Sequence, residues 1–425
     1  MYKRIISLNF VIIFVFAAAV NAQQKFVANL TGSQDVPANN SPGKGVCKFT
    51  LNQSETNVLI DCVYSNLSSP TNGFLSLGNA PIGQLPSMIL GLSTGTGGTS
   101  GSFSRTLNLT SQQVTDFRAN RFFAALNASS GPGNGIRGQI HVANGTYNDY
   151  DGDSRADLVV YRSSNSNYYS LGSLNRNYRE QNFGTSGGSS SLNADYDGDG
   201  LTDFSIARTV NGQITWYIFN SENNTLRQVD WGNQTLGDFF ASADYDGDGK
   251  FDIATYRAGV WYIIESSTGN PRYEFFGQSA DAPCPNDYDK DGKWDLAVAR
   301  NEGGVRVWYA KLSSNGQFRR IEFGLSSDAF FTGRTDFDGD GAADILVIRN
   351  IGGQRNFYIL RSSDNQFQVI PWGLSSDLPK LADYDGDGKT DSAVNRNLNG
   401  EKLWFILQSS NNQPRYDFFG LASDF

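Results

Sequence analysis

A nine-residue acidic phrase recurs six times in this chain. Each copy has aspartate at positions 1, 3, 5 and 9 and an aromatic residue at position 2, and successive copies begin 43 to 49 residues apart. We number these phrases loops 1 to 6. Six copies of four aspartates account for 24 of the 43 acidic residues. Loop by loop, the aspartates are Asp149, Asp151, Asp153 and Asp157; Asp195, Asp197, Asp199 and Asp203; Asp244, Asp246, Asp248 and Asp252; Asp287, Asp289, Asp291 and Asp295; Asp336, Asp338, Asp340 and Asp344; Asp383, Asp385, Asp387 and Asp391.

Four carboxylates within nine residues repel one another unless a cation neutralises them. Calcium takes roughly six to eight oxygen ligands in flexible geometry, and a backbone carbonyl near position 7 and water molecules can complete such a shell. Glycine at position 6 of loops 2 to 6 permits the sharp turn that brings the early ligands round an ion. We therefore expect the aspartates to bind up to six Ca²⁺ ions, one in each loop.

Other metals fit this pattern less well. Magnesium keeps several waters and seldom uses an all-protein cage. Zinc is disfavoured because the loops contain neither cysteine nor histidine. An EF-hand is excluded, since it needs a glutamate at position 12, where these phrases have Val, Ile or Thr. Loop 1 has Ser154 instead of glycine at position 6 and adds Arg155, so we expect it to bind its ion more weakly; in loop 4, Lys290 replaces the glycine at position 4.

Three further features recur after every acidic loop. An arginine stands thirteen residues after the first aspartate, an aromatic pair follows it, and the unit closes with an aromatic residue and a glycine. The arginines are Arg162, Arg208, Arg257, Arg300, Arg349 and Arg396; the pairs begin at Tyr168, Trp216, Trp261, Trp308, Phe357 and Trp404; the closing aromatics are Phe183, Trp231, Phe276, Phe323, Trp372 and Phe419. One arginine in every unit favours pairing with aspartate or stacking on a ring over a glycan or phosphate site.

Short apolar runs punctuated by glycine and asparagine indicate β-strands throughout, with one or two helical turns over residues 111–120. Each unit holds four such runs, and the acidic loop joins the first to the second. Units of about 47 residues with four strands match β-propeller blades. We predict an all-β chain whose residues 144–425 form a six-bladed propeller of four-stranded blades, packed through the aromatic pairs. A seven-bladed or incomplete ring and an open solenoid are the alternatives.

The first 22 residues have the features of a signal peptide: a basic start, an apolar stretch and small residues ending at Ala22. The apolar stretch is short for a membrane span, which needs about 20 residues. We therefore expect cleavage and export to the cell surface or medium, and no membrane span in the mature chain. Disulfides are permitted in such surroundings.

Residues 24–143 lack the repeat, and we expect them to form a separate β-sandwich or barrel-like domain. Pairing Lys48 with Asp61 across a hairpin places Cys47 opposite Cys62, which predicts a disulfide between them. Cys284, the third cysteine, is expected to be a buried free thiol.

With these residues in hand, residues 148–425 resemble the FG-GAP/VCBS family of integrin-like repeats, through the Asp-rich loops and the Phe-Gly or Trp-Gly closures. The resemblance implies a calcium-bearing propeller, which in that family usually serves adhesion and recognition. The first region resembles a CHRD (chordin-type) domain, through its opening phrase at residues 30–37 and its closing phrase at residues 136–140. That family often carries histidines at positions where this chain has residues 74–77 and 124–127, which contain none.

These observations favour a binding protein over an enzyme. His141, the single histidine, would have to serve any Ser-His-Asp site, and no nucleophile motif accompanies it. The formal net charge is −9, and it becomes −11 when the signal peptide is removed. Six bound divalent cations would bring the mature chain to about +1. No cluster of basic residues indicates nucleic-acid binding. We expect an exported, non-catalytic recognition or adhesion protein with an extracellular protein or glycan ligand. The alternatives are a lectin-like propeller or an accessory part of a polysaccharide-degrading system, and then an Asp- or Arg/Lys-based lyase or hydrolase.

Overall fold

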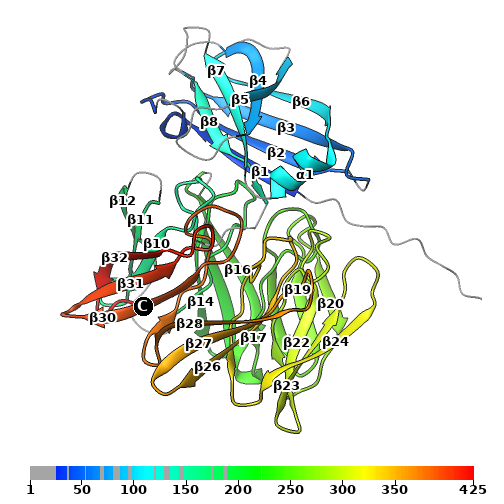
Figure 1. Cartoon of the computed structure of the whole chain (residues 1–425), viewed down its shortest axis with the longest axis vertical. Coiled ribbons are helices and arrows are strands. Elements are labelled where there is room, and N and C mark those ends of the chain that lie inside the picture. The colour runs from blue at the N-terminus through cyan, green and yellow to red at the C-terminus, as the bar shows by residue number, and fades with distance from the viewer. Residues whose placement is uncertain are drawn as a thin grey trace, which may run out of the picture.

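The computed structural model of the chain describes residues 25–35, 38–52, 54–67, 71–79, 87–93, 98–118, 121–128, 135–142, 148–173, 176–184, 189–221 and 223–425. The expected signal peptide lies outside these residues, as does the segment 143–147 between the two halves. The N-terminal domain stands on one face of a ring of blades (Figure 1). The described secondary structure is β-sheet except for one α-helix and two short 3-10 helices, which confirms the all-β prediction.

The N-terminal domain is built on one nine-stranded sheet, in the order β5-β4-β7-β8-β1-β2-β3-β6 with β9 paired to β1. Its strands are β1 (Lys25–Thr31), β2 (Lys44–Leu51), β3 (Asn57–Ser65), β4 (Thr71–Asn79), β5 (Ser87–Ser93), β6 (Gly101–Asn108), β7 (Phe122–Ala128), β8 (Ile136–Gln139) and β9 (His141–Val142). Every other residue of β3 is buried, as expected for a strand with one face on a core. The helix α1 (Ser111–Arg118) lies over this core, where Phe117 packs against Phe26 with ring centroids 5.5 Å apart.

Local capping fixes the start of α1. The Thr110 N–H donates to the Gln113 side chain at 2.8 Å, and the Gln113 N–H donates to the Thr110 hydroxyl at 3.3 Å, which is a capping box.

The predicted disulfide is present in the sheet. Cys47 lies opposite Cys62 between β2 and β3, and a disulfide joins them. Lys48 pairs with Asp61 in the same register.

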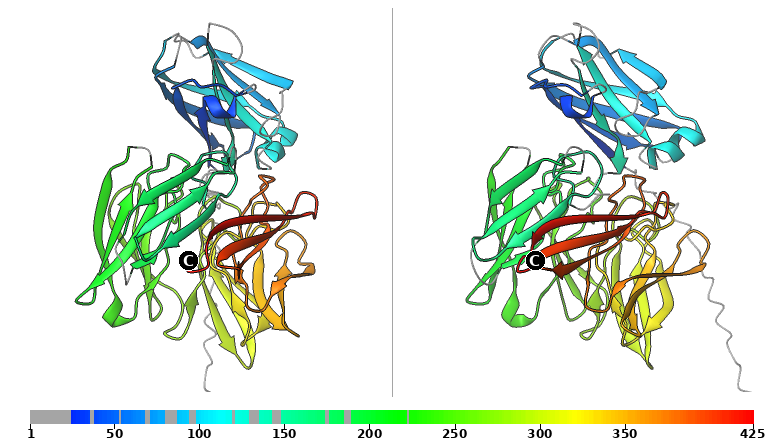
Figure 2. Two further views of the ribbon diagram at one scale, coloured as in Figure 1. Left: turned by 90° about the vertical axis from the view of Figure 1, so that its left-hand side faces the viewer. Right: turned by 60° about the vertical axis from the view of Figure 1, so that its left-hand side comes forward.

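Six blades form the propeller, and their sheets follow chain order without crossovers (Figure 2). The blade strands are β10 (Leu158–Arg162), β11 (Asn167–Leu171) and β12 (Tyr178–Asn182); β13 (Ser189–Ser191), β14 (Phe204–Val210), β15 (Gln213–Phe219) and β16 (Leu226–Asn233); β17 (Phe239–Phe240), β18 (Ile253–Arg257), β19 (Val260–Ile264) and β20 (Pro271–Phe275); β21 (Ala282–Pro283), β22 (Leu296–Glu302), β23 (Val305–Lys311) and β24 (Phe318–Leu325); β25 (Ala329–Phe330), β26 (Ile345–Ile351), β27 (Gln354–Leu360) and β28 (Phe367–Leu374); β29 (Leu378–Pro379), β30 (Ser392–Leu398), β31 (Glu401–Leu407) and β32 (Pro414–Leu421). The 3-10 helices are η1 (Gly32–Gln34) and η2 (Gln234–Leu236).

The first residue of each aromatic pair packs within the propeller, which confirms a packing role over a ligand platform. The side chains of Trp216 and Trp261 are fully buried, and each indole N–H donates to the carbonyl of the aromatic residue that closes its own unit, at 2.8 and 2.9 Å. Trp308 and Trp404 repeat this bond. A buried indole must have such a partner, so the closing aromatic-glycine phrase and the aromatic pair are two halves of one contact.

The ring closes between the last blade and the first. The sheet of the first blade has three strands of its own, and Phe425 supplies the missing inner position. Its N–H donates to the Tyr161 carbonyl at 2.9 Å, and the Tyr161 N–H donates to the Phe425 carbonyl at 3.1 Å. β32 lies beside β10 in all views (Figures 1 and 2). The six units therefore form a closed six-bladed ring rather than a seven-bladed ring or an open solenoid.

The repeated arginines hold this scaffold together. Five of them pair with a buried aspartate that lies just before the inner strand of the same blade: Arg162–Asp424, Arg257–Asp238, Arg300–Asp281, Arg349–Asp328 and Arg396–Asp377, at 2.6–3.0 Å. All six guanidinium groups lie over the second ring of their own aromatic pair, at 4.3–5.9 Å from its centroid. The repeated arginines therefore pair with aspartates and stack on aromatic rings, as predicted, which favours a scaffold role over a glycan- or phosphate-binding one.

Candidate metal centres

The six acidic loops form a hydrogen-bonded circle about the propeller axis. The backbone N–H at position 8 of each loop donates to the position 1 carbonyl of the preceding loop, at 2.6–2.8 Å. The bonds run from Thr202 to Asp149, Phe251 to Asp195, Trp294 to Asp244, Ala343 to Asp287, Thr390 to Asp336 and, closing the circle, Ala156 to Asp383. Each loop joins the inner strand of a blade to its second strand, as predicted. Neighbouring loops are therefore joined by backbone hydrogen bonds, so a shift of the backbone in one loop would also displace the next loop.

Backbone N–H groups turn the carboxylates of each loop inward, and loop 3 is representative. The Asp244 carboxylate accepts from the Gly247 N–H at 2.6 Å and from the Gly249 N–H at 2.9 Å. Both glycines have positive φ, 76° and 89°, a conformation that costs other residues more. Asp252, at position 9, accepts from the position 2 N–H at 2.9 Å and from the Ser266 N–H at 2.6 Å. The loop is thus preformed by its own acidic residues.

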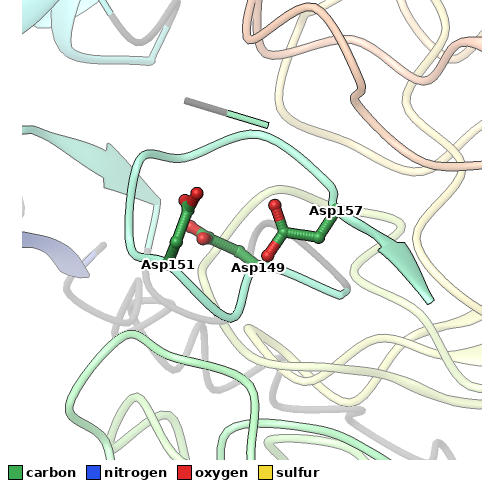
Figure 3. Close-up of side chains that lie close together, drawn as sticks. All are labelled: Asp149, Asp151 and Asp157. Atoms are coloured by element: carbon green, nitrogen blue, oxygen red, sulfur yellow. The ribbon is translucent and has the colours of Figure 1, made fainter. Parts of the chain in front are cut away.

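The structure brings aspartates of each loop together. In each of five groups, oxygens from three carboxylates lie within 4.8 Å of one another, and Figure 3 shows the first of these, Asp149, Asp151 and Asp157. The groups are Asp149, Asp151 and Asp157; Asp195, Asp197 and Asp199; Asp244, Asp246 and Asp248; Asp287, Asp289 and Asp291; and Asp336, Asp338 and Asp344. In loop 6, burial and then repulsion from the other three aspartates raise the pKa of Asp383 well above its usual range, so these carboxylates are also close together.

Burial makes these clusters electrostatically unfavourable as bare anions. Desolvation, followed by repulsion from neighbouring aspartates, raises the pKa of Asp244 to about 8. The same two causes raise the pKa of Asp157 to about 9 and that of Asp199 to about 8. The pKa values of the position 1 carboxyls Asp195 and Asp287 lie well above the usual range for the same reasons. A bound cation would remove the penalty by compensating the charge.

Serines from the loop between the third and fourth strands of each blade complete the surroundings, and the sequence interpretation missed them. In blade 4, the Ser313 hydroxyl donates to Asp291 at 2.9 Å and the Ser313 N–H donates to Asp295 at 2.6 Å. The equivalent first serines are Ser173, Ser221, Ser266, Ser362 and Ser409. In four blades a second serine follows and bonds the position 3 carboxylate. The signal was present in the sequence as a recurring Ser-Ser after the third strand.

Cations lie near several of the loops, and in loop 5 they reach the carboxylates. Arg155 lies against Gly386 of loop 6, just as the position 7 lysines Lys250, Lys293 and Lys389 lie against the position 4 glycines of the loops before them. Arg155 therefore follows a shared arrangement. In loop 5, Arg334 reaches a carboxylate oxygen of Asp336 at 3.6 Å, and Lys290 of loop 4 lies 3.8 Å from Asp340. Loop 5 thus has part of its negative charge compensated by the protein.

The donor set fits a hard divalent cation. The five groups consist of aspartate oxygens alone, the ligands that calcium prefers. The backbone and serine bonds hold these oxygens in place, as outer-shell partners of metal ligands do. The aspartates at positions 1, 3, 5 and 9 would hold the ion in each loop, and its charge would stabilise the ionised carboxylates.

The closed ring and its acidic loops define a six-bladed β-propeller protein with an N-terminal β-domain. The chain matches the CHRD domain over residues 26–140 and the FG-GAP-like repeat over residues 195–255. These matches confirm the two resemblances that the sequence motifs indicated: the first lies in the N-terminal domain and the second lies within the propeller. No curated protein matches the chain. Within the described residues, the structure contains no helix long and apolar enough to cross a membrane.

Several solved structures are similar to this chain at low sequence identity. A protein from Lactobacillus plantarum is 9% identical over 62% of this chain and 81% of its own, with a TM-score of 0.34. An auxiliary nutrient binding protein from Bacteroides thetaiotaomicron is 10% identical over 85% and 94%, with a TM-score of 0.32. An exotype rhamnogalacturonan lyase is 11% identical over 87% and 72%, with a TM-score of 0.29. These identities and TM-scores are too low for a function to transfer from any of them.

Proposed function

We propose that the chain is an exported, non-catalytic recognition or adhesion protein whose propeller is stabilised by one Ca²⁺ ion in each acidic loop. The observation that carries this proposal is the buried aspartate cluster, repeated around the ring with the same inward-turned carboxylates. Buried carboxylates of raised pKa gain most from an ion that restores their charge. Export through a signal peptide cleaved after Ala22 would place these loops where calcium is plentiful.

Calcium would act as a structural element in this proposal. One site filled at about 10–100 times its dissociation constant stabilises a fold by roughly 1.4–2.7 kcal/mol. Several such sites rival the stability of a typical domain, about 5–15 kcal/mol. Because the loops are hydrogen-bonded to one another, the ions would also tie neighbouring blades together.

The repeated aspartates and most of the repeated arginines are engaged in the scaffold. The aspartates are gathered in the loops, and five of the repeated arginines are paired with other aspartates. His141 is buried in β9, opposite Val27 of β1 in the N-terminal domain. These positions favour binding over turnover.

Thermal unfolding in calcium and in chelator tests the proposal. The melting temperature should rise with calcium concentration and return on chelation, and magnesium at the same concentration should have a smaller effect. An unchanged melting temperature in chelator would show that the loops do not hold structural ions.

A lectin-like function is the second candidate, and exposed aromatic rings on the outer strands favour it. Phe275 and Phe318 are 81% and 74% exposed. Phe318 stacks on Phe276 of the preceding blade with centroids 5.8 Å apart and planes 15° from parallel. Flat rings at a blade boundary suit the apolar face of a sugar. A glycan array probed in calcium and again in chelator separates this function from protein adhesion, and hydrolysis or elimination of any bound polysaccharide would argue for an enzyme.

A further inference from the structure

The strand β1 of the N-terminal domain has two buried faces. Phe26, Ala28 and Leu30 point into the core of that domain. Val27 and Asn29 alternate with them, and so lie on the opposite side of the sheet, yet they are only 3% and 7% exposed. Something other than the domain core covers this second face.

Acidic loops 1 and 2 of the propeller cover it. The Gln34 amide donates to the Gly152 carbonyl of loop 1 at 2.8 Å, and Gln34 is itself held within its domain by a bond to the Asn29 carbonyl at 3.1 Å. A Cβ atom added to Gly152 would lie 3.0 Å from the Asn29 side chain. One added to Gly200 of loop 2 would lie 2.8 Å from Val27. The two domains therefore meet at glycine backbone, with no room for a side chain.

The loops across the ring are open at the equivalent positions. Lys290 takes the place of Gly152 in loop 4, and its side chain is 52% exposed. Gly341 takes the place of Gly200 in loop 5, and an added Cβ would meet only Lys290, at 3.9 Å. The N-terminal domain is thus seated off centre, on one part of the circle.

The docking glycines are fixed by the aspartates that would bind the ions. Asp149 accepts from the Gly152 N–H at 2.6 Å, and Asp195 accepts from the Gly200 N–H at 2.8 Å. A loop that loses its ion leaves buried carboxylates uncompensated, and relaxation of those carboxylates moves the glycine backbone bonded to them. Close backbone packing tolerates little movement.

We propose that ions in loops 1 and 2 hold the N-terminal domain on the propeller, so that calcium controls the arrangement of the two domains. This inference rests on the proposed function, because it requires the loops to bind calcium. Loops 3 to 6 would then serve the ring alone. Since coupling between ion binding and docking is reciprocal, undocking the domain must also weaken ion binding at loops 1 and 2.

Small-angle X-ray scattering of the full chain, with bound calcium counted on the same samples, tests this. The radius of gyration of the unsubstituted protein should increase in chelator. Asp195→Asn in loop 2 should give the larger radius in calcium, whereas Asp287→Asn, the matched change in loop 4, should keep the smaller one. Each substitution should remove about one ion.

A pair of substitutions on the N-terminal side guards against a folding defect in loop 2. Val27→Glu should undock the domain in calcium and lower the calcium affinity of two sites, those in loops 1 and 2, and Val63→Glu on the 62% exposed side chain of β3 should do neither. If Asp195→Asn loses its ion and stays compact, or if Val27→Glu stays compact, the coupling is refuted while the calcium sites stand. If the unsubstituted protein binds no calcium, the proposed function fails first, and the inference with it.

Discussion

The closure of the propeller makes a quantitative prediction for Asp424→Asn. Asp424 has no exposed side-chain surface and holds Arg162 through two bonds of 2.8 and 2.9 Å. It also accepts from the Leu421 N–H at 2.8 Å. Next to it, Phe425 provides the backbone pairing that completes the first blade. This pair is therefore part of the contact that joins the last unit to the first.

Removing one partner of a buried ion pair costs about 3–5 kcal/mol. Asparagine keeps one acceptor, so we expect a loss of roughly 2–4 kcal/mol in the free energy of unfolding. At about 2–4 °C per kcal/mol, that corresponds to roughly 4–16 °C in melting temperature. Calorimetry in saturating calcium measures it, and hydrogen exchange should show the loss of protection concentrated in the first and last blades.

Two controls make this prediction refutable. Asp364→Asn removes an arginine pair whose side chains are 34% and 41% exposed, and it should cost about 1 kcal/mol or less. Asp377→Asn removes the equivalent buried pair with Arg396 inside the ring, and it should destabilise the protein without exposing the first blade. If Asp424→Asn behaves like Asp364→Asn, the terminal pair does not close the ring and the reasoning is wrong.

Three other outcomes follow from the loops. Arg334→Gln should raise calcium affinity at loop 5, because the Arg334 guanidinium lies 3.6 Å from Asp336 and competes with an ion; calcium titration by calorimetry checks this against Arg361→Gln. Ser409→Ala should weaken binding at loop 6 by about tenfold or more, since it removes an outer-shell bond of 2.8 Å to Asp387; the same titration measures it. In chelator, stability should fall as pH rises from about 4 to 7, and calcium should abolish the trend. The reason is that burial raises the folded-state pKa of the position 9 carboxyls to about 7, above the unfolded value, so the folded state binds more protons in that range; these are Asp203, Asp252, Asp295, Asp344 and Asp391. Urea unfolding at a series of pH values follows it.

Much of this architecture could be predicted because the same motifs recur at the same spacing in all six repeats. The spacing of Asp149 and its five equivalents set the blade size, the aromatic pairs set the packing, and the register of Lys48 with Asp61 set the disulfide. Local pattern carries such information, since strand alternation and turn chemistry act over a few residues.

Other features could not be predicted because they depend on parts of the chain far apart in sequence. The partner of Arg162 is Asp424, 262 residues away, and the partner of Gln34 is Gly152, 118 residues away. The circle of backbone bonds between loops exists only once six blades are in place. The serines recur in the sequence, but the carboxylates that they bond lie 14–25 residues earlier in the chain, so the contact is not visible in the loop itself.

Counting the calcium bound to each chain decides whether the acidic loops are ion sites. The full chain is dialysed against calcium at physiological ionic strength, and the metal per chain is measured by elemental analysis alongside a sample dialysed against chelator. We expect five to six ions per chain, with loop 1 or loop 5 the first to empty as calcium is lowered, and near zero in chelator. One ion or none in saturating calcium would contradict it, because the six aspartate clusters would then be holding their charge by some other means.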